Sequence, residues 1–223
     1  MPVYNEAHTI RRVIEAALSA ALPDAVEREL IVVDDGSVDE TAAIVDGLNE
    51  PRLQLLRLEH NRGKGSAIRA GIPLARGDWI LIQDGDMEYD PSCYAALVEP
   101  LVEGRARVVY GSRFLGRIER MDWPYRLVNR LLVLETNLLY GAGITDEATA
   151  YKAFEAQLLK ELDLRSRRFE FCPEVTGKLC RRGVRIHEVP VRYLGRTPAQ
   201  GKKIRWYDAV VAFWVLLRER FRR

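Results

Sequence analysis

Short apolar runs alternate with helical patterns over the first half of the chain. The apolar runs span residues 29–35, 53–59, 79–84 and 107–112, and the helical patterns span about 6–21, 38–49, 64–76 and 92–103. Short runs rich in branched side chains are typical of buried strands. Strands that alternate with helices predict an α/β fold, with a mostly parallel sheet and helices on both faces. Ligands of such sheets bind beyond the carboxyl ends of the strands.

The second half is less regular, but its patterns continue without a repeat or a clear linker. We expect a long helix over 123–141, a second helix over 153–162 and a loop that enters a helix over 168–183. A strand over 186–193 and a last helix over about 205–222 follow. A basic loop with glycine and proline precedes the last helix. The chain is therefore expected to form a single domain, 1–223.

The start of the chain departs from the α/β pattern. It opens on MPVYNE, and no apolar run precedes these residues. A parallel α/β domain usually opens with a strand, and residues 2–5 resemble the loop that follows one. We therefore expect the first strand to be missing or trimmed.

Composition excludes several classes of function. A formal net charge of +2 gives no field that would favour nucleic acid. No apolar window is long enough to span a bilayer, and no N-terminal signal segment is present. The cysteines form no close ligand pair and the three histidines are scattered, which argues against zinc and suits a reducing cytoplasm. The cysteines are Cys93, Cys172 and Cys180.

The apolar run 79–84 ends in a dense acidic segment, QDGDMEYD. Asp84 and Asp86 are one residue apart, so in an extended segment their side chains share a face, and Gly85 allows a tight turn. Oxygen ligands of this kind select a hard divalent cation, which would also remove the repulsion between the carboxylates. The alternative is a solvated acidic turn.

Two further motifs fall at similar places. Asp34 and Asp35 end the run 29–35, where an aspartate can accept hydrogen bonds from a base or ribose; the alternative is a capped strand-to-helix turn. Gly63 and Gly65 flank Lys64 at an expected helix start, where N–H groups and a lysine favour an anion. The alternative there is a plain glycine-rich helix entry.

Eight segments together resemble the family 2 glycosyltransferases. They are MPVYNE, VVDDGSVDET, NRGKGSAIRAG, QDGDMEYDP, YGSRFLG, TDEATAYKAF, RFEFCPEVTGKL and GRTPAQGKKIRWYDA, in family order over nearly the whole chain. The most similar branch comprises the polyprenyl-phosphate glycosyltransferases that resemble dolichyl-phosphate mannose synthase. The resemblance implies a GT-A (Rossmann-like) fold, a UDP- or GDP-linked sugar donor and Mg²⁺ or Mn²⁺. It also implies a nucleotide-sugar and metal half at about 1–113 and an acceptor half at about 114–204.

The resemblance assigns residues to these roles. It implies metal ligation by Asp84 and Asp86, with Glu88 where relatives often have glutamine. With Lys64 added from its own motif, the expected substrate-binding residues are Pro2, Tyr4, Glu6, Asp35, Lys64, Asp84, Arg196, Lys202 and Lys203. The expected catalytic residues are Arg113, Asp146 and Glu174. Two departures are the absent first strand, which would weaken the nucleotide pocket, and Gly85, which replaces the usual alanine and would loosen the metal turn.

The implied reaction is inverting transfer of a hexose, and two acceptors stay open. A lipid phosphate is already anionic and needs no strong base. A hydroxyl acceptor on a glycan or small molecule would require Asp146 or Glu174 to take its proton; alternatively, Glu174 is a helix-start carboxylate. A catalytically inactive nucleotide-sugar binder is a further alternative. A phospho-accepting signalling domain would leave the second-half motifs without a purpose.

The expected last helix, within 205–223, is both basic and amphipathic. Apolar side chains follow helical spacing along one broad side, namely Trp206, Val210, Phe213, Trp214, Leu217 and Phe221. Arginines crowd its end, which is typical of a helix that lies in a membrane interface. The alternative is a core-packing helix with a solvated basic end. We therefore predict a cytoplasmic protein with peripheral contact to the cytoplasmic membrane face.

Overall fold

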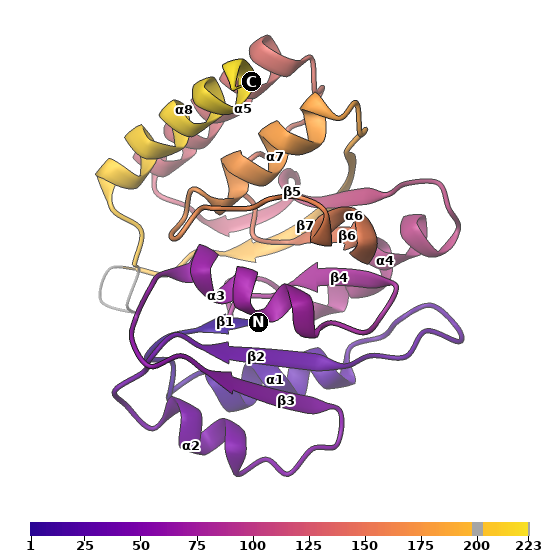
Figure 1. Cartoon of the computed structure of the whole chain (residues 1–223), viewed down its shortest axis with the longest axis vertical. Helices are drawn as coiled ribbons and strands as arrows, with labels where there is room; N and C mark the ends of the chain where they lie inside the picture. Colours follow the sequence, from indigo (N-terminus) through magenta and orange to yellow (C-terminus); the bar gives the residue numbers. More distant parts are fainter. Residues whose placement is uncertain (198–202, 223) are drawn as a thin grey trace.

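The computed structural model describes residues 1–197 and 203–222, in which seven strands form two sheets (Figure 1). The first sheet has the order β1-β2-β3 and all its pairs are parallel; the second has the order β4-β6-β5-β7. The strands are β1 (Pro2–Val3), β2 (Leu30–Asp34), β3 (Leu53–Arg57), β4 (Trp79–Ile82), β5 (Val108–Arg120), β6 (Lys152–Glu155) and β7 (His187–Leu194).

Helices cover both faces of the sheets, as the alternating pattern predicted. They are α1 (Ile10–Ser19), α2 (Thr41–Asp46), α3 (Lys64–Gly71), α4 (Tyr94–Val102), α5 (Trp123–Tyr140), α6 (Ala156–Lys160), α7 (Phe171–Arg181) and α8 (Trp206–Phe221). Short 3₁₀ turns follow α3 at Ile72–Leu74 and precede α4 at Pro91–Cys93. In Figure 1, α5, α7 and α8 form a layer at the top of the view, and α3 lies in front of the strands that α1 and α4 cover from behind. Among the described residues, no helix combines the length and the apolar character that crossing a membrane requires.

The first strand is present but short. Pro2 and Val3, which were expected to lie in a loop, form a two-residue strand parallel to β2. The backbone N–H of Val33 donates to the Met1 carbonyl, and that of Asp35 donates to the Val3 carbonyl. These bonds fix β1 against β2 and so hold the start of the loop that carries Tyr4 and Glu6.

The second half contains a strand that the sequence pattern did not predict. Residues 152–155, which overlap the helix expected at 153–162, form β6, antiparallel to both β4 and β5, so the second sheet is mixed. Only the following short helix, α6, matches the helical pattern. Periodicity cannot separate strand from helix in a segment this short. The expected strand at 107–112 also continues, as β5, to Arg120 and pairs with β7.

The alternation of side chains along β5 builds a core on each side of the second sheet. Val108 and Tyr110 pack with Phe154 and with the buried side of α7, whereas Val109 faces a second cluster that includes Leu97 of α4. Successive side chains of a strand point to opposite faces, so one strand contributes to both clusters. The two packed faces hold the strand ends, which carry the functional residues, in fixed relative positions.

Candidate active site

The turn after β4 is anchored by a buried amide. The Oε1 atom of Gln83 accepts hydrogen bonds from the hydroxyls of Tyr94 (2.6 Å) and Tyr151 (2.7 Å), and its Nε2 donates to the carbonyl of Asp84 (2.9 Å). All three side chains are buried. They fix the point at which the chain leaves the sheet and turns the acidic segment outward.

The residue between the two aspartates lies against β1. A Cβ atom built on Gly85 would lie 2.5 Å from Cγ1 of Val3, closer than packed atoms approach. The carbonyl of Gly85 accepts a hydrogen bond from the hydroxyl of Thr9 (3.2 Å). Gly85 therefore lets the turn and the end of β1 come together, a physical reason for the departure from the family pattern.

The two aspartates are each held by a cation in the structure. Nζ of Lys64, at the start of α3, lies 2.7 Å from Oδ1 and 2.8 Å from Oδ2 of Asp84. A guanidinium nitrogen of Arg196 lies 2.7 Å from Oδ2 of Asp86. Burial, the largest influence, lowers the pKa of Lys64, but the surrounding acidic groups, Asp84 foremost, together raise the pKa above its ordinary value. Both aspartate side chains keep 17% of their surface exposed, so a ligand can reach them.

A third carboxylate joins this cluster from the loop after β1. Glu6 receives two hydrogen bonds of 3.0 Å from Arg196 and one of 2.7 Å from Nζ of Lys203. Lys203 also donates to the carbonyl of Tyr4 and lies 5.6 Å from the centre of its ring. Residues from the two ends of the chain thus share one charged cluster, and Lys202 lies outside the described residues.

Glu88 serves the loop after β7. One of its carboxylate oxygens accepts from the backbone N–H of Arg196 (2.6 Å) and the other from the hydroxyl of Tyr193 (3.2 Å). Its own N–H donates to Oδ1 of Asp86 (3.0 Å). Glu88 therefore positions Arg196 over the acidic turn, a role that its predicted metal ligation did not anticipate.

Asp35 lies at the end of β2 and holds the loop that leads into α3. It accepts hydrogen bonds from the backbone N–H groups of Arg62 (2.9 Å) and Gly63 (2.7 Å), while burial raises its pKa. Gly63 has φ +97°, and a Cβ there would lie 2.5 Å from the carbonyl oxygen of Arg167. The glycine thus permits the turn that leads into Lys64 and α3.

Arg113 and Asp146 form a buried pair on the other side of the cluster. Nε and a terminal nitrogen of Arg113 each lie 2.7 Å from one oxygen of Asp146, and the backbone N–H of Arg113 donates to the same carboxylate (2.9 Å). The guanidinium also lies 5.1 Å from the centre of the Tyr193 ring. Through Tyr193 and Glu88, this pair is linked by direct contacts to Arg196 and Asp86.

Glu188, on β7, was not recognised from the sequence. Its carboxylate accepts from the backbone N–H groups of Thr145 (2.7 Å) and Asp146 (3.0 Å), and so holds the loop that presents Asp146. A single glutamate in an alternating strand carries no local signal of this role. Only the pairing of β5 with β7 brings it beside the loop.

Glu174 does not join the cluster through any contact described. Its carboxylate accepts from the backbone N–H groups of Arg165 and Ser166 and from Lys178, at 2.6–3.0 Å. The side chain is completely buried in the first turn of α7. These contacts suit a helix-start carboxylate with a structural role, the alternative that the sequence left open.

Glu147 is a second buried acid that the sequence analysis missed. Burial raises its pKa to about 7, and its Oε2 has no hydrogen-bond partner among the described residues. The neighbouring Lys152 is also buried; it donates to the carbonyl of Glu147 (2.6 Å), and its Nζ lies 3.7 Å from the centre of the Tyr110 ring. The region behind Asp146 therefore contains two buried titratable side chains, Glu147 and Lys152.

The donor atoms of the acidic turn suit a divalent cation. Asp84 and Asp86 offer only oxygen, which Mg²⁺ and Mn²⁺ prefer, and both remain partly exposed. Within residues 1–197 and 203–222, no three His, Cys, Asp or Glu side chains converge into a ready-made metal site. A metal held here would have to share or displace the contacts with Lys64 and Arg196.

Comparison with known proteins assigns a family. Residues 1–163 match the family model described as glycosyl transferase family 2. The chain is 44% identical over 153 residues to the succinoglycan biosynthesis protein ExoO of Rhizobium meliloti, a match that covers 61% of this chain and 41% of that protein. It is 29% identical over 232 residues to the polyprenol monophosphomannose synthase of Mycolicibacterium smegmatis, covering 96% of this chain and 84% of that one. The chain thus spans less than half of the first relative.

Solved structures show the same fold. Glucosyl-3-phosphoglycerate synthase from Mycobacterium tuberculosis, in complex with Mn²⁺, uridine diphosphate and phosphoglyceric acid, superposes with a TM-score of 0.73 at 21% identity. The match covers 99% of this chain and 76% of that one. The likeness confirms the predicted α/β fold of the GT-A type.

Proposed function

The chain belongs to glycosyl transferase family 2, and from this premise we propose that it transfers a hexose from a nucleotide-sugar to a polyprenyl phosphate, with inversion at the anomeric carbon. The observation that carries the proposal is the meeting of Glu6, Asp84 and Asp86 with Lys64, Arg196 and Lys203 at one edge of the sheets. Carboxylates suit a divalent cation, and cations suit the oxygens of a diphosphate. Both are needed where a sugar–diphosphate bond breaks.

On the donor side, we assign the acidic turn to Mg²⁺ or Mn²⁺ and the surrounding cations to phosphate oxygens. When bound, the metal would act as a Lewis acid that stabilises charge on the departing diphosphate. Lys64, Arg196 and Lys203 would add charge-assisted hydrogen bonds as their carboxylate partners turn to the metal. Pro2, Tyr4 and Asp35, at the ends of β1 and β2, are assigned to the base and ribose of a UDP- or GDP-linked donor. Lys202 keeps its proposed phosphate-binding role from the sequence alone.

The proposed acceptor follows from the hydrogen bonds of the two candidate bases, Asp146 and Glu174. Both oxygens of Asp146 are bonded to Arg113, and both oxygens of Glu174 accept from backbone N–H groups. Both side chains are also completely buried, so neither is exposed to take a proton from a hydroxyl. An anionic phosphate oxygen needs no such base: it attacks the anomeric carbon while the bond to the donor diphosphate breaks. The names of relatives from M. smegmatis and Micrococcus luteus, a polyprenol monophosphomannose synthase and an undecaprenyl-phosphate mannosyltransferase, support the same acceptor class.

The acceptor class can be tested by direct transfer. Radiolabelled GDP-mannose and UDP-glucose would be supplied with Mn²⁺ and either a short-chain polyprenyl phosphate or the matching polyprenol. We expect label in the lipid phosphate product alone. Equal transfer to the alcohol would support the hydroxyl acceptor. If neither donor is hydrolysed or used for transfer, the result would support the inactive binder.

Peripheral membrane contact is the second part of the proposal, and the exposed side of α8 supports it. Ala212, Val215 and Leu216 pack inward, whereas six apolar side chains of this helix are exposed: Trp206, Val210, Val211, Trp214, Leu217 and Phe221. The neighbouring α5 adds Trp123, Leu127, Leu131, Leu134 and Leu138 to the exposed apolar set. In Figure 1 the two helices lie side by side at the top of the molecule. Arg218, Arg220 and Arg222 near the end of α8 favour an anionic surface.

Vesicle flotation tests this contact. We expect the chain to float with vesicles that contain anionic lipid, and the double variant Trp206→Ser, Trp214→Ser to float at least about fivefold less. Val38→Ser is the matched control, because Val38 is 85% exposed and lies in the loop before α2, far from α8 in the sequence. An unchanged double variant, or an equal loss in the control, would remove α8 from the proposal.

A further inference from the structure

A groove of about 610 Å³ lies beside the carboxyl end of α8, and it combines basic with apolar side chains. One arginine comes from the loop before α7, and the other lining residues come from α8 and the position after it. In Figure 1 this end of α8 lies at the top of the molecule, next to the label C. The described residues that line the groove are Arg165, Arg218, Arg222, Trp214, Leu217 and Phe221.

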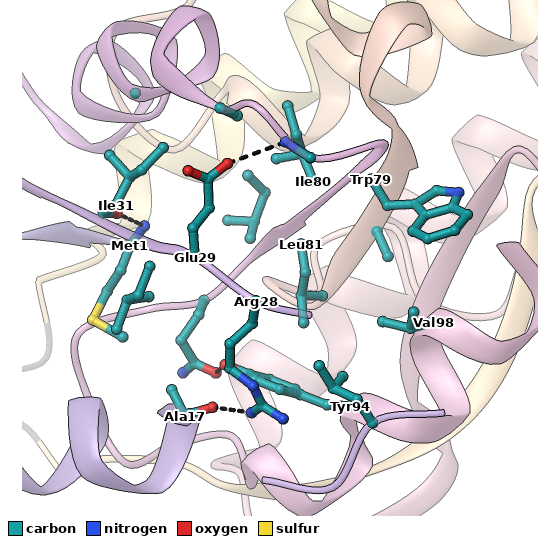
Figure 2. A pocket seen from close by; sticks show the side chains of 18 of the residues that line it. Met1, Ala17, Arg28, Glu29, Ile31, Trp79, Ile80, Leu81, Tyr94 and Val98 are labelled. Carbon is teal, nitrogen blue, oxygen red and sulfur yellow. Dashed lines mark hydrogen bonds between the residues drawn. The ribbon is translucent and has the colours of Figure 1, made fainter. Parts of the chain in front are cut away.

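The cavity between β2 and β4, of about 470 Å³, differs from this groove in the partners of its charged side chains (Figure 2). Arg28 donates there to the carbonyl of Ala17 (2.5 Å). Glu29 accepts from the backbone N–H groups of Arg76 (2.6 Å) and Gly77 (3.1 Å). The backbone of the chain therefore holds both charges in that cavity. In the part of the chain that the structure describes, the arginine side chains of the α8 groove bond only to carboxylates.

These carboxylates are too few to neutralise the arginines. Arg218 and Arg222 lie 2.8 Å and 3.4 Å from the same oxygen, Oε1 of Glu219, whose side chain is completely buried. Arg165 lies 2.5 Å from Asp163, but the two side chains are 60% and 71% exposed, and such surface pairs contribute little. The three guanidinium groups thus face two carboxylates, which leaves one positive charge in surplus.

The ligand that fits this wall is a phosphate group joined to an apolar chain. Guanidinium groups match phosphate oxygens in geometry and bind them through charge-assisted hydrogen bonds. The exposed side chains of Trp214, Leu217 and Phe221 follow the spacing i, i+3 and i+7, so they share one side of α8. A free anion would leave these apolar side chains in water, whereas the chains of a lipid would cover them.

The groove is separate from the acidic turn of the candidate active site. Within residues 1–197 and 203–222, no hydrogen bond or ion pair joins its lining residues to Asp84 or Asp86. A phosphate held in the groove would therefore differ from the phosphates of the donor and the acceptor, which we assign to the active site.

We propose that the groove binds the headgroup phosphate of an anionic phospholipid, with the acyl chains of the lipid along Trp214, Leu217 and Phe221. The inference rests on the proposed membrane contact of α8 and gives that contact a defined ligand. Binding would depend on the forked geometry of the arginines, and not on the net charge of the surface alone.

The first test uses a monomeric lipid, so it requires neither a membrane nor transfer activity. Dihexanoyl phosphatidic acid, below the concentration at which it forms micelles, would be titrated into the ¹⁵N-labelled chain. We expect a saturable shift of the Trp214 indole N–H signal, which Trp214→Phe would assign. Inorganic phosphate and dihexanoyl phosphatidylcholine should bind at least about tenfold more weakly, because the first lacks the chains and the second lacks net charge.

The other outcomes of this titration overturn the proposal. Equal binding of inorganic phosphate would make the groove a site for a free anion, and equal binding of phosphatidylcholine would remove the role of the arginines. Equal binding of the acetylated peptide Glu-Leu-Leu-Glu-Leu amide would assign the groove to an acidic protein segment. If the Trp214 signal does not shift while the chain still floats with anionic vesicles, the proposed membrane contact stands and only the defined site fails.

The second test keeps the charge and changes the geometry. The double variant Arg218→Lys, Arg222→Lys retains both cations beside Glu219, and its Kd for the short-chain lipid should rise at least about fivefold. The control, Arg185→Lys with Arg220→Lys, should leave the Kd within about twofold, because neither residue lines the groove. An unchanged Kd in the first variant, or an equal rise in both, would overturn the proposal.

A single variant outside α8 guards against a folding defect in the double variant. Arg165→Lys changes an exposed side chain of the loop before α7, so the fold should keep its Tm within about 2 °C. Its Kd for the short-chain lipid should rise at least about threefold. An unchanged Kd in this variant would contradict the assignment of Arg165 to the phosphate site.

Discussion

The two groups of ion pairs in the candidate active site differ in exposure and in geometry. Lys64–Asp84 and Arg196–Asp86 retain between 13% and 20% of their side-chain surface, whereas Arg113–Asp146 retains 6% and 0%. The first group has one cation contact for each aspartate; the second has a bidentate pair with a backbone N–H added. Partly exposed pairs can exchange a partner for a ligand, while a buried bidentate pair cannot lose one without a large cost. We therefore assign binding and metal exchange to the first group and positioning to the second.

The largest expected effect is on the rate of transfer, through the partly exposed ion pairs. Asp84→Asn removes a carboxylate that we assign to the metal, so the rate of transfer should fall at least about 100-fold, or ~3 kcal/mol of transition-state stabilisation. Initial rates with Mn²⁺ measure this effect. The control is Asp163→Asn, since Asp163 is an exposed aspartate paired with Arg165. A loss below about threefold, or an equal loss in the control, would break the assignment.

The next effect is on the stability that the buried group provides. Asp146→Asn leaves the Arg113 guanidinium buried without its counter-charge, so the free energy of unfolding should fall by about 3 kcal/mol. Urea denaturation measures this difference, and Asp163→Asn should leave the midpoint almost unchanged. A midpoint for Asp146→Asn that matches the control would mean that the two groups do not differ as we infer.

A third prediction concerns the pH dependence of the buried region. The pKa of Glu147 rises from 4.5 to about 7 on folding because the carboxylate is buried. The folded state therefore holds the proton more tightly, and this group lowers stability as the pH rises from about 4.5 to about 7. Glu147→Gln should stabilise the chain by roughly 2 kcal/mol at pH 8 and change it little at pH 4.5. Urea denaturation at both pH values measures the effect; an equal change at both would contradict the cause.

The smallest expected effect is on the binding of Mn²⁺ and UDP when Lys64 is replaced. Lys64 contacts both oxygens of Asp84, so it competes with a metal for that carboxylate. Lys64→Gln should tighten binding of Mn²⁺ alone by about fivefold, or ~1 kcal/mol, and weaken binding of UDP. Isothermal titration measures both constants. Weaker Mn²⁺ binding in the variant would show that Lys64 supports the metal site instead.

Sequence patterns predicted the features of this molecule that are set by residues close together in the sequence. The acidic turn after 79–84 and the glycine-flanked Lys64 lie at strand and helix ends, as periodicity indicated. The family resemblance assigned Arg113 and Asp146 to the catalytic residues, and the structure places their side chains in contact.

The contacts between distant parts could not be predicted. Arg196 meets Glu6 and Asp86 only because β7 pairs with β5 and returns the chain to the acidic turn. The strand β6 was expected as helix, since four residues show no decisive period. The buried state of Glu147 depends on packing against α7, for which a single acidic letter in the sequence gives no signal.

Metal-dependent nucleotide binding tests the central claim most directly. Thermal shifts would be recorded for the chain with UDP and with GDP, each with and without Mn²⁺, and for the Asp86→Asn variant under the same conditions. We expect one nucleotide to raise Tm more with Mn²⁺ than without it, and the variant to lose that additional rise. An additional rise that persists in Asp86→Asn, or stabilisation by neither nucleotide with Mn²⁺, would contradict the account.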